Sequence, residues 1–351
     1  MAEFEVEFDL DTDIEFDMDV EAVPGAMDAF YEKEFWFSYS SMKLLLYNPP
    51  AFAEKYINKN YEERLDKHLI AGKLIHCLIL QPDEFPEMFI ISPLSVPTGK
   101  NRDIIHNIFK HHRATGGNDL RTLDSYGDQM LQELVNVNLH QSLKLDSARL
   151  DKMMTDENKS YFDYQLTRGS KNVIDQKQLD YCAAAAKVIT GNPEMCRLMG
   201  IGADPAFNQV INEQMYYIPQ PGRKFGLKGV IDNINIDHAG KIIYVNDFKT
   251  TGKELSEFPE AVQFFCYHYQ AMIYLQLVIF HFKTLLAQEY KVEFRFIAID
   301  KNMQAYAFKV TNGTLNSWLE TFNRRLSEAA YHYDNKSFDL PYAFANKLVS
   351  L

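Results

Sequence analysis

Three residues at the ends of two predicted strands have the types and spacing that hydrolytic chemistry needs. Asp232 ends one strand-like run, and Asp247 and Lys249 lie in the next. Side chains two positions apart on a strand leave the same face, and a neighbouring antiparallel strand can bring Asp232 beside Asp247. Two adjacent carboxylates are costly unless a cation neutralises them. Such oxygen ligands suit Mg²⁺ or Mn²⁺ better than zinc, so the pattern predicts a site for a hard divalent cation.

The lysine beside these carboxylates has a chemical use of its own. Lys249 can orient or help deprotonate an attacking water, or neutralise the charge that develops on a phosphate. A second interpretation stays open, because a single Asp-x-Lys occurs often by chance and also fits a surface ladder on a solvated sheet face. Whether these residues form a metal site or a surface ladder depends on the elements that position them.

Three β-rich runs position these residues. Turn signals at 220–222 and 238–240 separate the runs, which predicts an antiparallel meander of Phe207–Tyr217, Phe225–Ile236 and Lys241–Thr250. A long apolar helix is predicted next at about 261–287, then strands near 292–299 and 304–311, then an amphipathic helix at about 315–333. This order predicts an α/β core with a mixed central sheet flanked by helices.

The N-terminal part of the chain is predicted to be mainly helical. Ser38–Ser41 is a helix-start cluster, and Asn48-Pro49-Pro50 stops that helix. Further helices are predicted at about 65–80, 126–140 and 175–190. Residues 92–125 are rich in turn formers and predict a long loop or insertion with a short helix.

The segment Lys100–Arg121 is rich in basic residues. It holds five bases, among them Arg102, with three histidines and only two acids. Such a stretch fits a solvated face, and it is also the first candidate for an arm that contacts phosphates. Both interpretations stay open.

The sequence resembles the PD-(D/E)XK nuclease superfamily, and within it the RecE-type phage 5′→3′ exonucleases and their RecB-like relatives. The resemblance lies in ordered pieces over residues 38–275. The pieces are Ser38–Lys43 with Asn48, Pro49 and Phe52; Ala71–His76 followed by Leu78, Leu80, Pro82, Asp83 and Phe85; Glu213; Lys228–Asp232; Asp247–Thr251; and Tyr267, Gln270, Ala271 and Tyr274. Each piece is weak alone, whereas their common order is fairly specific.

The resemblance implies a role for each matching residue. The implied metal ligands are His76, Asp232, Asp247 and the Phe248 carbonyl. Lys249 would be the catalytic lysine, and Glu213 would assist the metal site or bind substrate. Gln270 and Tyr274 would brace the site or touch DNA. Ser41 and Lys228, which lie in the matching pieces, are further candidate substrate contacts, and Arg102 is a candidate from the basic segment and not from the resemblance.

Several of these residues also have a structural interpretation. His76 fits a satisfied core histidine, and Glu213 fits an exposed strand carboxylate. Gln270 and Tyr274 fit helix packing, because neighbouring apolar residues mark that helix as buried: Phe264, Phe265, Met272 and Ile273.

The resemblance implies that the protein is a metal-dependent DNA exonuclease that uses two Mg²⁺ or Mn²⁺ ions. It would resect double-stranded DNA ends 5′→3′ in phage-type recombination, beside a single-strand annealing protein and as a ring-like homo-oligomer. The cysteine-held iron–sulfur cluster of some relatives is not expected, since no C-x-x-C is present. The rivals are a structure-specific endonuclease on the same core and a non-catalytic module that binds nucleic acid or protein.

The charge of the chain is concentrated at its N-terminus. Residues 1–34 hold 13 acids and one base, so they carry the whole formal charge of −12 and residues 35–351 are neutral. From Glu3 to Glu21 acids alternate with mostly apolar residues, which would repeat carboxylates every ~6.6 Å on an extended chain. A solvated disordered tail is one interpretation. The other is an ordered or DNA-like tail that competes for the chain's own DNA groove or binds a basic partner.

The 351 residues are predicted to form two parts, an acidic tail at 1–34 and a single elaborated nuclease domain at 35–351 with an insertion at about 97–175. The sequence has no apolar run near bilayer length and no signal peptide, so no membrane partner is expected. The four cysteines are expected to be reduced thiols. These features predict a cytoplasmic protein, in the host cytoplasm if the chain is phage-encoded.

Overall fold

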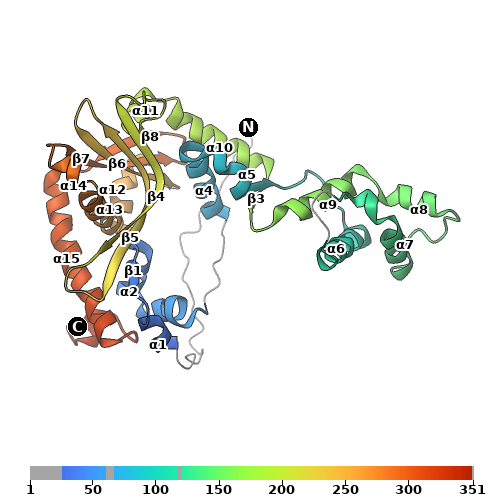
Figure 1. The fold of residues 1–351 in the computed structure, drawn as a ribbon, viewed down its shortest axis with the longest axis horizontal. Coiled ribbons are helices and arrows are strands. Elements are labelled where there is room, and N and C mark those ends of the chain that lie inside the picture. The colour runs from blue at the N-terminus through green and yellow to red at the C-terminus, as the bar shows by residue number, and fades with distance from the viewer. Residues whose placement is uncertain (1–25, 61–66, 117–120, 350–351) are drawn as a thin grey trace. The chain divides into compact units, whose positions relative to one another are not determined.

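The sheet that carries the predicted acidic residues has six strands in a mixed arrangement (Figure 1). The computed structural model describes residues 26–60, 67–116 and 121–349, and every structural statement below refers to them. The strand order is β1-β5-β6-β7-β8, and β4 pairs with β5 outside this path. The strands are β1 (Phe35–Phe37), β4 (Asn208–Pro219), β5 (Phe225–Asp237), β6 (Ile242–Thr251), β7 (Lys291–Asp300) and β8 (Ala305–Lys309).

The directions of the strands follow from how they are connected. β4, β5 and β6 form an antiparallel meander, as the turn signals between the three runs predict. β7 runs parallel to β6, and the helices between them supply the crossover that a parallel pair requires. β8 returns antiparallel to β7, and β1 lies parallel to the start of β5. The chain is therefore a mixed α/β protein with helices flanking a mixed central sheet.

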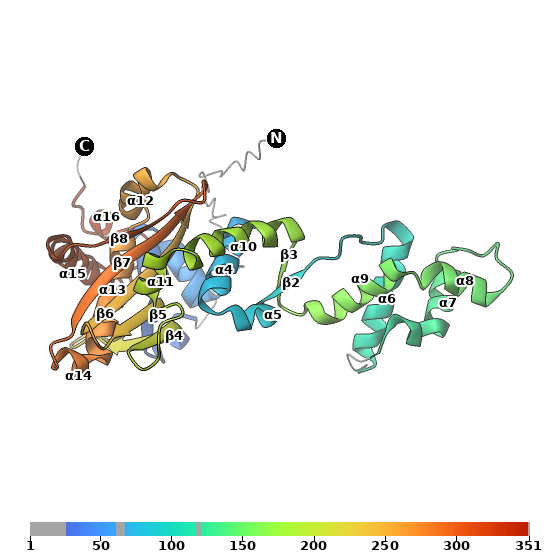
Figure 2. The same cartoon turned by 90° about the horizontal axis from the view of Figure 1, so that it is seen from above.

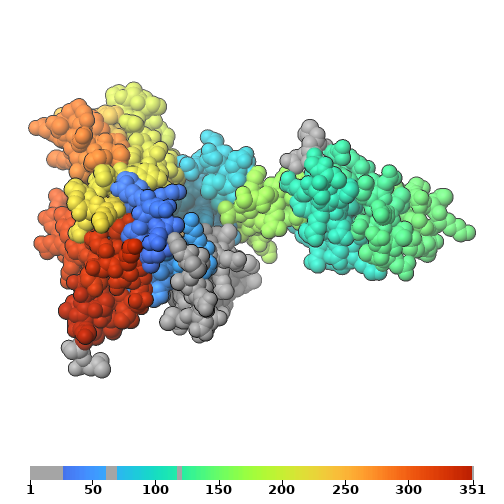
Figure 3. Space-filling model, turned by 60° about the horizontal axis from the view of Figure 1, so that its bottom comes forward, coloured from blue at the N-terminus to red at the C-terminus, as the bar shows by residue number. Residues whose placement is uncertain are grey.

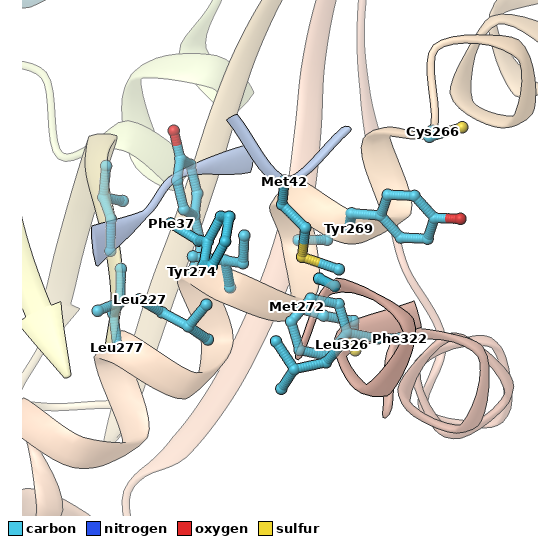
Figure 4. Close-up of a cluster of buried hydrophobic side chains, with 14 of the residues drawn as sticks. Phe37, Met42, Leu227, Cys266, Tyr269, Met272, Tyr274, Leu277, Phe322 and Leu326 are labelled. Carbon is cyan, nitrogen blue, oxygen red and sulfur yellow. The ribbon is translucent and has the colours of Figure 1, made fainter. Parts of the chain in front are cut away.

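One face of the sheet, called the α13 face below, packs against α2 (Tyr39–Tyr47), α13 (Tyr267–His281) and α15 (Asn312–Asn335). Figure 4 shows this core, where Met42 of α2 lies near Met272 of α13 and Phe322 of α15. The other helices of this part are α1 (Ala26–Tyr31), α3 (Pro49–Phe52), the π-helix η1 (Ala53–Asn58), α11 (Pro193–Met199), the 3-10 helix η4 (Leu255–Glu257), α12 (Phe258–Phe264), α14 (Lys283–Leu286) and α16 (Tyr342–Ala345).

The opposite face, called the α11 face, is held by a row of buried asparagines. Asn233 donates to the Met199 carbonyl at 3.0 Å and to Asn212 Oδ1 at 2.7 Å. Asn246 donates to the Leu198 carbonyl at 3.0 Å and to Asn233 Oδ1 at 2.7 Å. Because the last carbonyls of a helix have no partner within the helix, these amides fix the end of α11 to three strands. In Figure 2, α11 and α15 lie on different sides of the strands.

The long helix predicted at 261–287 is interrupted twice. α12 ends at Phe264, α13 begins at Tyr267, and α14 follows at Lys283. The first break lies at Cys266, whose backbone is left-handed with φ 58°. A right-handed helix cannot continue through a left-handed residue, which explains the break. The apolar pattern of the sequence continues across Cys266 and therefore did not predict it.

Contacts divide the chain into two compact units. The sheet unit comprises Met1–Asp66, Ile79–Gln81 and Ala185–Leu351, and the helical unit comprises Lys67–Leu78 and Pro82–Ala184. Two helices run from one unit into the other, α4 (Lys67–Leu80) and α10 (Gln176–Thr190), and both agree with their predicted spans. The single elaborated domain stays a prediction. The insertion expected at 97–175 lies entirely within the helical unit.

The helical unit has a core of its own, formed by residues such as Ile104, Met130 and Phe162. The segment predicted as a loop with a short helix contains the 16-residue α6, because its isoleucines form an apolar stripe among the turn formers. Besides α4 and α10, the helical unit contains the 3-10 helices η2 (Pro82–Glu84) and η3 (Leu123–Tyr126), the helices α5 (Phe85–Met88), α6 (Gly99–Ala114), α7 (Gly127–Asn136), α8 (Asp146–Met153) and α9 (Asp156–Arg168), and the parallel strands β2 (Phe89–Ile91) and β3 (Asn172–Ile174).

The last residues of the predicted acidic tail are part of the sheet unit. α1 packs against the core, and the Tyr31 hydroxyl donates to the Tyr333 carbonyl of α15 at 2.5 Å. Figure 3 shows the N-terminal residues (blue) against the C-terminal helices (red) on this surface. The rest of the predicted tail, residues 1–25, lies outside the described residues.

Within the described ranges, no helix combines the length and the apolar character needed to cross a bilayer.

Candidate active site

The candidate site lies where β5 and β6 separate. β4 pairs along almost the whole of β5, so β1 and β6 share its other edge, β1 at Phe225–Leu227 and β6 from Asn233 onward. The β5–β6 ladder ends with Asn233 opposite Asn246, and the next residues on the two strands are Asp232 and Asp247. The two carboxylates predicted to be neighbours therefore stand at the same level of the sheet, at the point where the strands part.

Asp232 closes this gap with its side chain. Its Oδ2 accepts a hydrogen bond from the Phe248 backbone N–H at 2.8 Å, in place of a backbone carbonyl of β5. Asp232 is only 7% exposed. The contact ties the carboxylate of one strand to the backbone of the other and fixes its position next to Asp247.

The alternation of side chains along β5 shifts by one residue at Asp232. Before this point Leu227 and Ile231 enter the core of the α13 face, and after it Ile234 and Ile236 do. Because successive strand residues normally point to opposite faces, the shift turns Asp232 to the same face as its neighbour Ile231. Asp232 thus joins Asp247 on the α13 face of the sheet.

Glu213 lies opposite Asp232 on β4 in an unusual backbone conformation. The β4–β5 register is the same on both sides of these two residues, but they are not themselves a pair of the ladder. Glu213 has a φ of 48°, in the left-handed region, which costs a non-glycine residue on the order of 1–3 kcal/mol. Carboxylate oxygens of Glu213 and Asp232 lie within 4.8 Å of each other. No signal in the sequence marks this conformation.

Asp247 is completely buried and is held by charged and polar groups. Lys249 Nζ lies 2.7 Å from its Oδ2, and Gln270 Nε2 donates to its Oδ1 at 3.0 Å. Gln270 Nε2 also donates to the Tyr274 hydroxyl at 2.8 Å. Gln270 thus connects Asp247 with Tyr274, and both side chains are buried; whether they brace the site or touch DNA stays a prediction.

The environment keeps Lys249 protonated. Burial acts to lower the pKa of this ammonium, but the carboxylates of Asp247 and Asp232 outweigh burial, so the pKa is raised above its ordinary value. The ammonium also lies 4.9 Å from the centre of the Tyr267 ring. Lys249 is therefore a fixed positive charge at neutral pH, and the sequence carries no separate signal for its contact with Tyr267.

Tyr274 lies close against β5 because residue 229 is glycine. A Cβ at Gly229 would lie 2.9 Å from Tyr274 Cε1, which is closer than real Cβ contacts. Burial, together with the nearby Asp232 and Asp247 carboxylates, raises the pKa of Tyr274 well above its ordinary value. Tyr274 therefore stays a neutral hydroxyl beside the carboxylates.

The other predicted substrate contacts have different surroundings. Ser41 is 1% exposed and forms a capping box with Ser38 at the start of α2. Lys228 is half-buried and precedes the shift at Asp232, so it points away from the α13 face. Contacts of Ser41 and Lys228 with DNA stay predictions.

Two predicted residues belong to the helical unit. His76 is half-buried on α4. Arg102 is exposed on α6, and its Nε lies 3.8 Å from Asp103 Oδ1. Other bases of the predicted arm contact their own unit, since Lys100 donates to the Val137 carbonyl and Arg113 to the Leu166 carbonyl.

No protein-family model matches the chain, and no curated protein matches it. Among solved structures, the chain is similar to the 2.19 Å crystal structure of a proposed exonuclease from Eubacterium rectale. The match has 11% sequence identity and a TM-score of 0.42, and it covers 90% of this chain and 88% of that chain.

Proposed function

We propose that the protein is a metal-dependent nuclease that hydrolyses phosphodiester bonds of DNA. The observation that carries the proposal is the pair of carboxylates Asp232 and Asp247 at one level of the sheet, with a Glu213 oxygen within 4.8 Å of Asp232 and the ammonium of Lys249 against Asp247. A surface ladder of charges does not fit, because Asp232 and Asp247 are buried. A buried excess of negative charge has a use if it holds a cation.

The residues present fit a divalent cation with oxygen ligands. Asp232 and Glu213 offer oxygens close enough to share one ion. Asp247 stands at the same level of the sheet, paired with Lys249, and its role as a further ligand is a proposal from the sequence resemblance. The sequence resemblance implies that His76 adds a nitrogen ligand, and this role stays a prediction. Mostly carboxylate ligands favour Mg²⁺ or Mn²⁺.

The chain's own residues supply position and charge for the reaction. A divalent cation held here would polarise the phosphate and make a bound water more acidic. Lys249, protonated and fixed by Asp247, would donate a hydrogen bond to a phosphate oxygen or to the attacking water. Gln270 holds Asp247 in one orientation. Lys249 thus acts as a charged donor in this proposal, and it does not need to accept a proton.

The sequence resemblance extends the proposal to a substrate and an assembly. The substrate would be a double-stranded DNA end resected 5′→3′ in phage-type recombination, the enzyme a ring-like homo-oligomer, and the partner a single-strand annealing protein. Binding of the acidic tail to a basic partner or to the DNA groove stays a prediction, since residues 1–25 lie outside the described part of the chain.

The test is digestion of linear and of covalently closed circular duplex DNA with Mg²⁺, using substrates labelled at the 5′ or the 3′ end. An exonuclease digests only the linear form, and early release of the 5′ label supports the proposed polarity. Cleavage of both forms would indicate a structure-specific endonuclease instead. Binding without cleavage of either form, with Mg²⁺ and with Mn²⁺, would indicate a non-catalytic module and overturn the proposal.

A further inference from the structure

An exposed phenylalanine lies in a segment that the sequence predicts to be buried, shortly before the helix that carries Gln270 and Tyr274. Phe264 is 75% exposed, although its apolar neighbours predict a buried helix. It ends α12, and only Phe265 and Cys266 separate it from α13. An exposed aromatic ring offers a flat face on which a nucleic-acid base can stack.

The segment that carries Phe264 is firmly held. The Phe265 N–H donates to the Ala261 carbonyl at 2.9 Å, and the Cys266 N–H donates to the Gln263 carbonyl at 3.1 Å. The Tyr39 hydroxyl donates to the Phe265 carbonyl. The exposed ring therefore stands on a backbone whose position is fixed before any ligand arrives, which lowers the entropy lost on binding.

One side of α2 lines the same segment. Tyr39, Lys43 and Tyr47 are spaced four residues apart, so they share one face of the helix. Lys43 Nζ lies 5.6 Å from the centre of the Phe265 ring, and the Tyr47 hydroxyl lies 3.4 Å from Cys266 Sγ. Lys43 is half-buried and Tyr47 is 50% exposed. Cationic and aromatic groups thus alternate along this surface.

A chain of ring contacts joins Phe264 to the catalytic lysine proposed above. The rings of Phe264 and Phe265 have centroids 5.0 Å apart, and those of Phe265 and Tyr267 are stacked at 5.4 Å. Lys249 Nζ lies 4.9 Å from the Tyr267 ring. The exposed ring is therefore two ring contacts away from the residue that holds the Lys249 ammonium. We call this surface the aromatic strip, and it consists of Tyr39, Lys43, Tyr47, Phe264, Phe265 and Tyr267.

We propose that the aromatic strip binds a single strand of DNA next to the phosphate that is cleaved. A base stacks on Phe264, and Lys43 contacts a backbone phosphate. Stacking of a base on an aromatic side chain contributes about 1–3 kcal/mol, and it tolerates any base sequence because every base has a flat face. The inference rests on the proposed nuclease function and assigns to the strip the strand that leaves the duplex.

The test compares Phe264→Ala and Phe264→Trp with a matched control, Phe344→Ala, which removes another exposed phenylalanine of the sheet unit from α16. Binding of a labelled single-stranded oligonucleotide is measured by fluorescence anisotropy, with Ca²⁺ in place of Mg²⁺. Phe264→Ala should weaken binding about 5- to 150-fold, which is the stacking energy expressed as an affinity ratio. Phe264→Trp should bind at least as tightly as wild type, and Phe344→Ala should not change binding.

A second variant tests the phosphate contact. Lys43→Gln should lower the salt dependence of single-strand binding by about 0.7 in the slope of log affinity against log salt, which is the contribution of one phosphate contact. Wild-type affinity of Phe264→Ala, or equal losses in Phe264→Ala and Phe264→Trp, would overturn the inference. The digestion of linear DNA by the wild-type protein is a separate measurement. If the wild-type protein does not cleave linear DNA, the nuclease function is refuted. If it cleaves and Phe264→Ala binds single-stranded DNA as tightly as wild type, only the proposed role of the aromatic strip is refuted.

Discussion

At the scale of single residues, the contact between Asp247 and Lys249 is the centre of the site. Asp247 is fully buried and the Lys249 side chain is 14% exposed, so water compensates neither charge well. In such a pair each charge depends on the other, and removal of one partner costs far more than removal of both.

Breaking this pair should separate stability from catalysis. Lys249→Met leaves Asp247 buried without its cation and should lower the free energy of unfolding by about 3–5 kcal/mol. The double variant Asp247→Asn/Lys249→Met should recover most of this loss, because no buried charge then lacks a partner. Urea denaturation in EDTA measures both effects. Equal stabilities of the single and double variants would show that the two charges are not coupled.

The same substitutions should abolish activity for a different reason. Asp247→Asn removes a proposed metal ligand, and Lys249→Met removes the charge proposed to face the phosphate, so each should slow cleavage at least about 10²-fold. Lys291→Met is the control, since it removes an exposed lysine from the neighbouring strand β7. Near-wild-type cleavage by either site variant would mean that the site is elsewhere.

At the scale of elements, the asparagine row on the α11 face supports the strands that carry the acids. Asn233 and Asn246 form the last pair of the β5–β6 ladder, one residue away from Asp232 and Asp247. Their amides connect β4, β5 and β6 to the end of α11. The row therefore keeps the strands together just before they part.

Asn233→Leu should destabilise the sheet unit without touching the acidic face. It removes the donors for the Met199 carbonyl and Asn212, and the acceptor for Asn246. Each buried group left without a partner costs about 1–3 kcal/mol, so unfolding should require several kcal/mol less. Asn107→Ala, which loses an exposed hydrogen bond to Glu133, is the control and should change stability by less than about 1 kcal/mol. A neutral Asn233→Leu would contradict this role.

Elements with regular patterns could be predicted from the sequence. The meander of β4, β5 and β6 has strand-forming runs with clear turns between them, and the level of Asp232 with Asp247 follows from that pairing. The left-handed Glu213 and Cys266 could not be predicted, because neither residue type favours that conformation. The shift at Asp232 is equally invisible, since both faces of β5 are buried there and no alternation shows in the residue types.

The packing of helices in the α6–α9 region was hidden by composition. Glycines and prolines near residues 93–117 favour loops locally, yet Ile104, Ile105 and Ile108 bury one side of α6 against α7 and α9. Tertiary burial outweighed local turn propensity there. For Phe264 the sequence predicts burial, because the residue is apolar and lies among buried apolar residues, whereas its side chain is exposed.

At the scale of the whole molecule, two buried histidines link stability to pH. Burial lowers the pKa of His268 and of His332, and His332 is fully buried with its Nδ1 2.6 Å from the Ser337 carbonyl. Below the ordinary histidine pKa of 6.5, these two histidines are protonated in the unfolded chain to a greater extent than in the folded protein. The histidine contribution to stability is therefore complete above this pH and decreases as the pH falls below it.

Acidification should thus destabilise the protein in a histidine-dependent way. The free energy of unfolding should fall between pH 7.5 and pH 5.5, and the fall should be smaller in the double variant His268→Gln/His332→Gln. Urea denaturation at pH 7.5, 6.5 and 5.5 measures the slope. The same slope in the variant and in the wild type would assign the pH dependence to other groups.

The parallel pairing of β1 with β5 has a consequence for synthesis on the ribosome. β1 (Phe35–Phe37) can pair only after Phe225–Leu227 of β5 has been synthesised, about 190 residues later. At translation rates of roughly 5–20 residues per second, this delay lasts roughly 10–40 seconds. The helical unit, which has its own core, emerges complete during that time. The nascent chain therefore keeps an aromatic β1 without its partner strand for most of its elongation, and chaperones that hold exposed aromatic segments would have their main opportunity there.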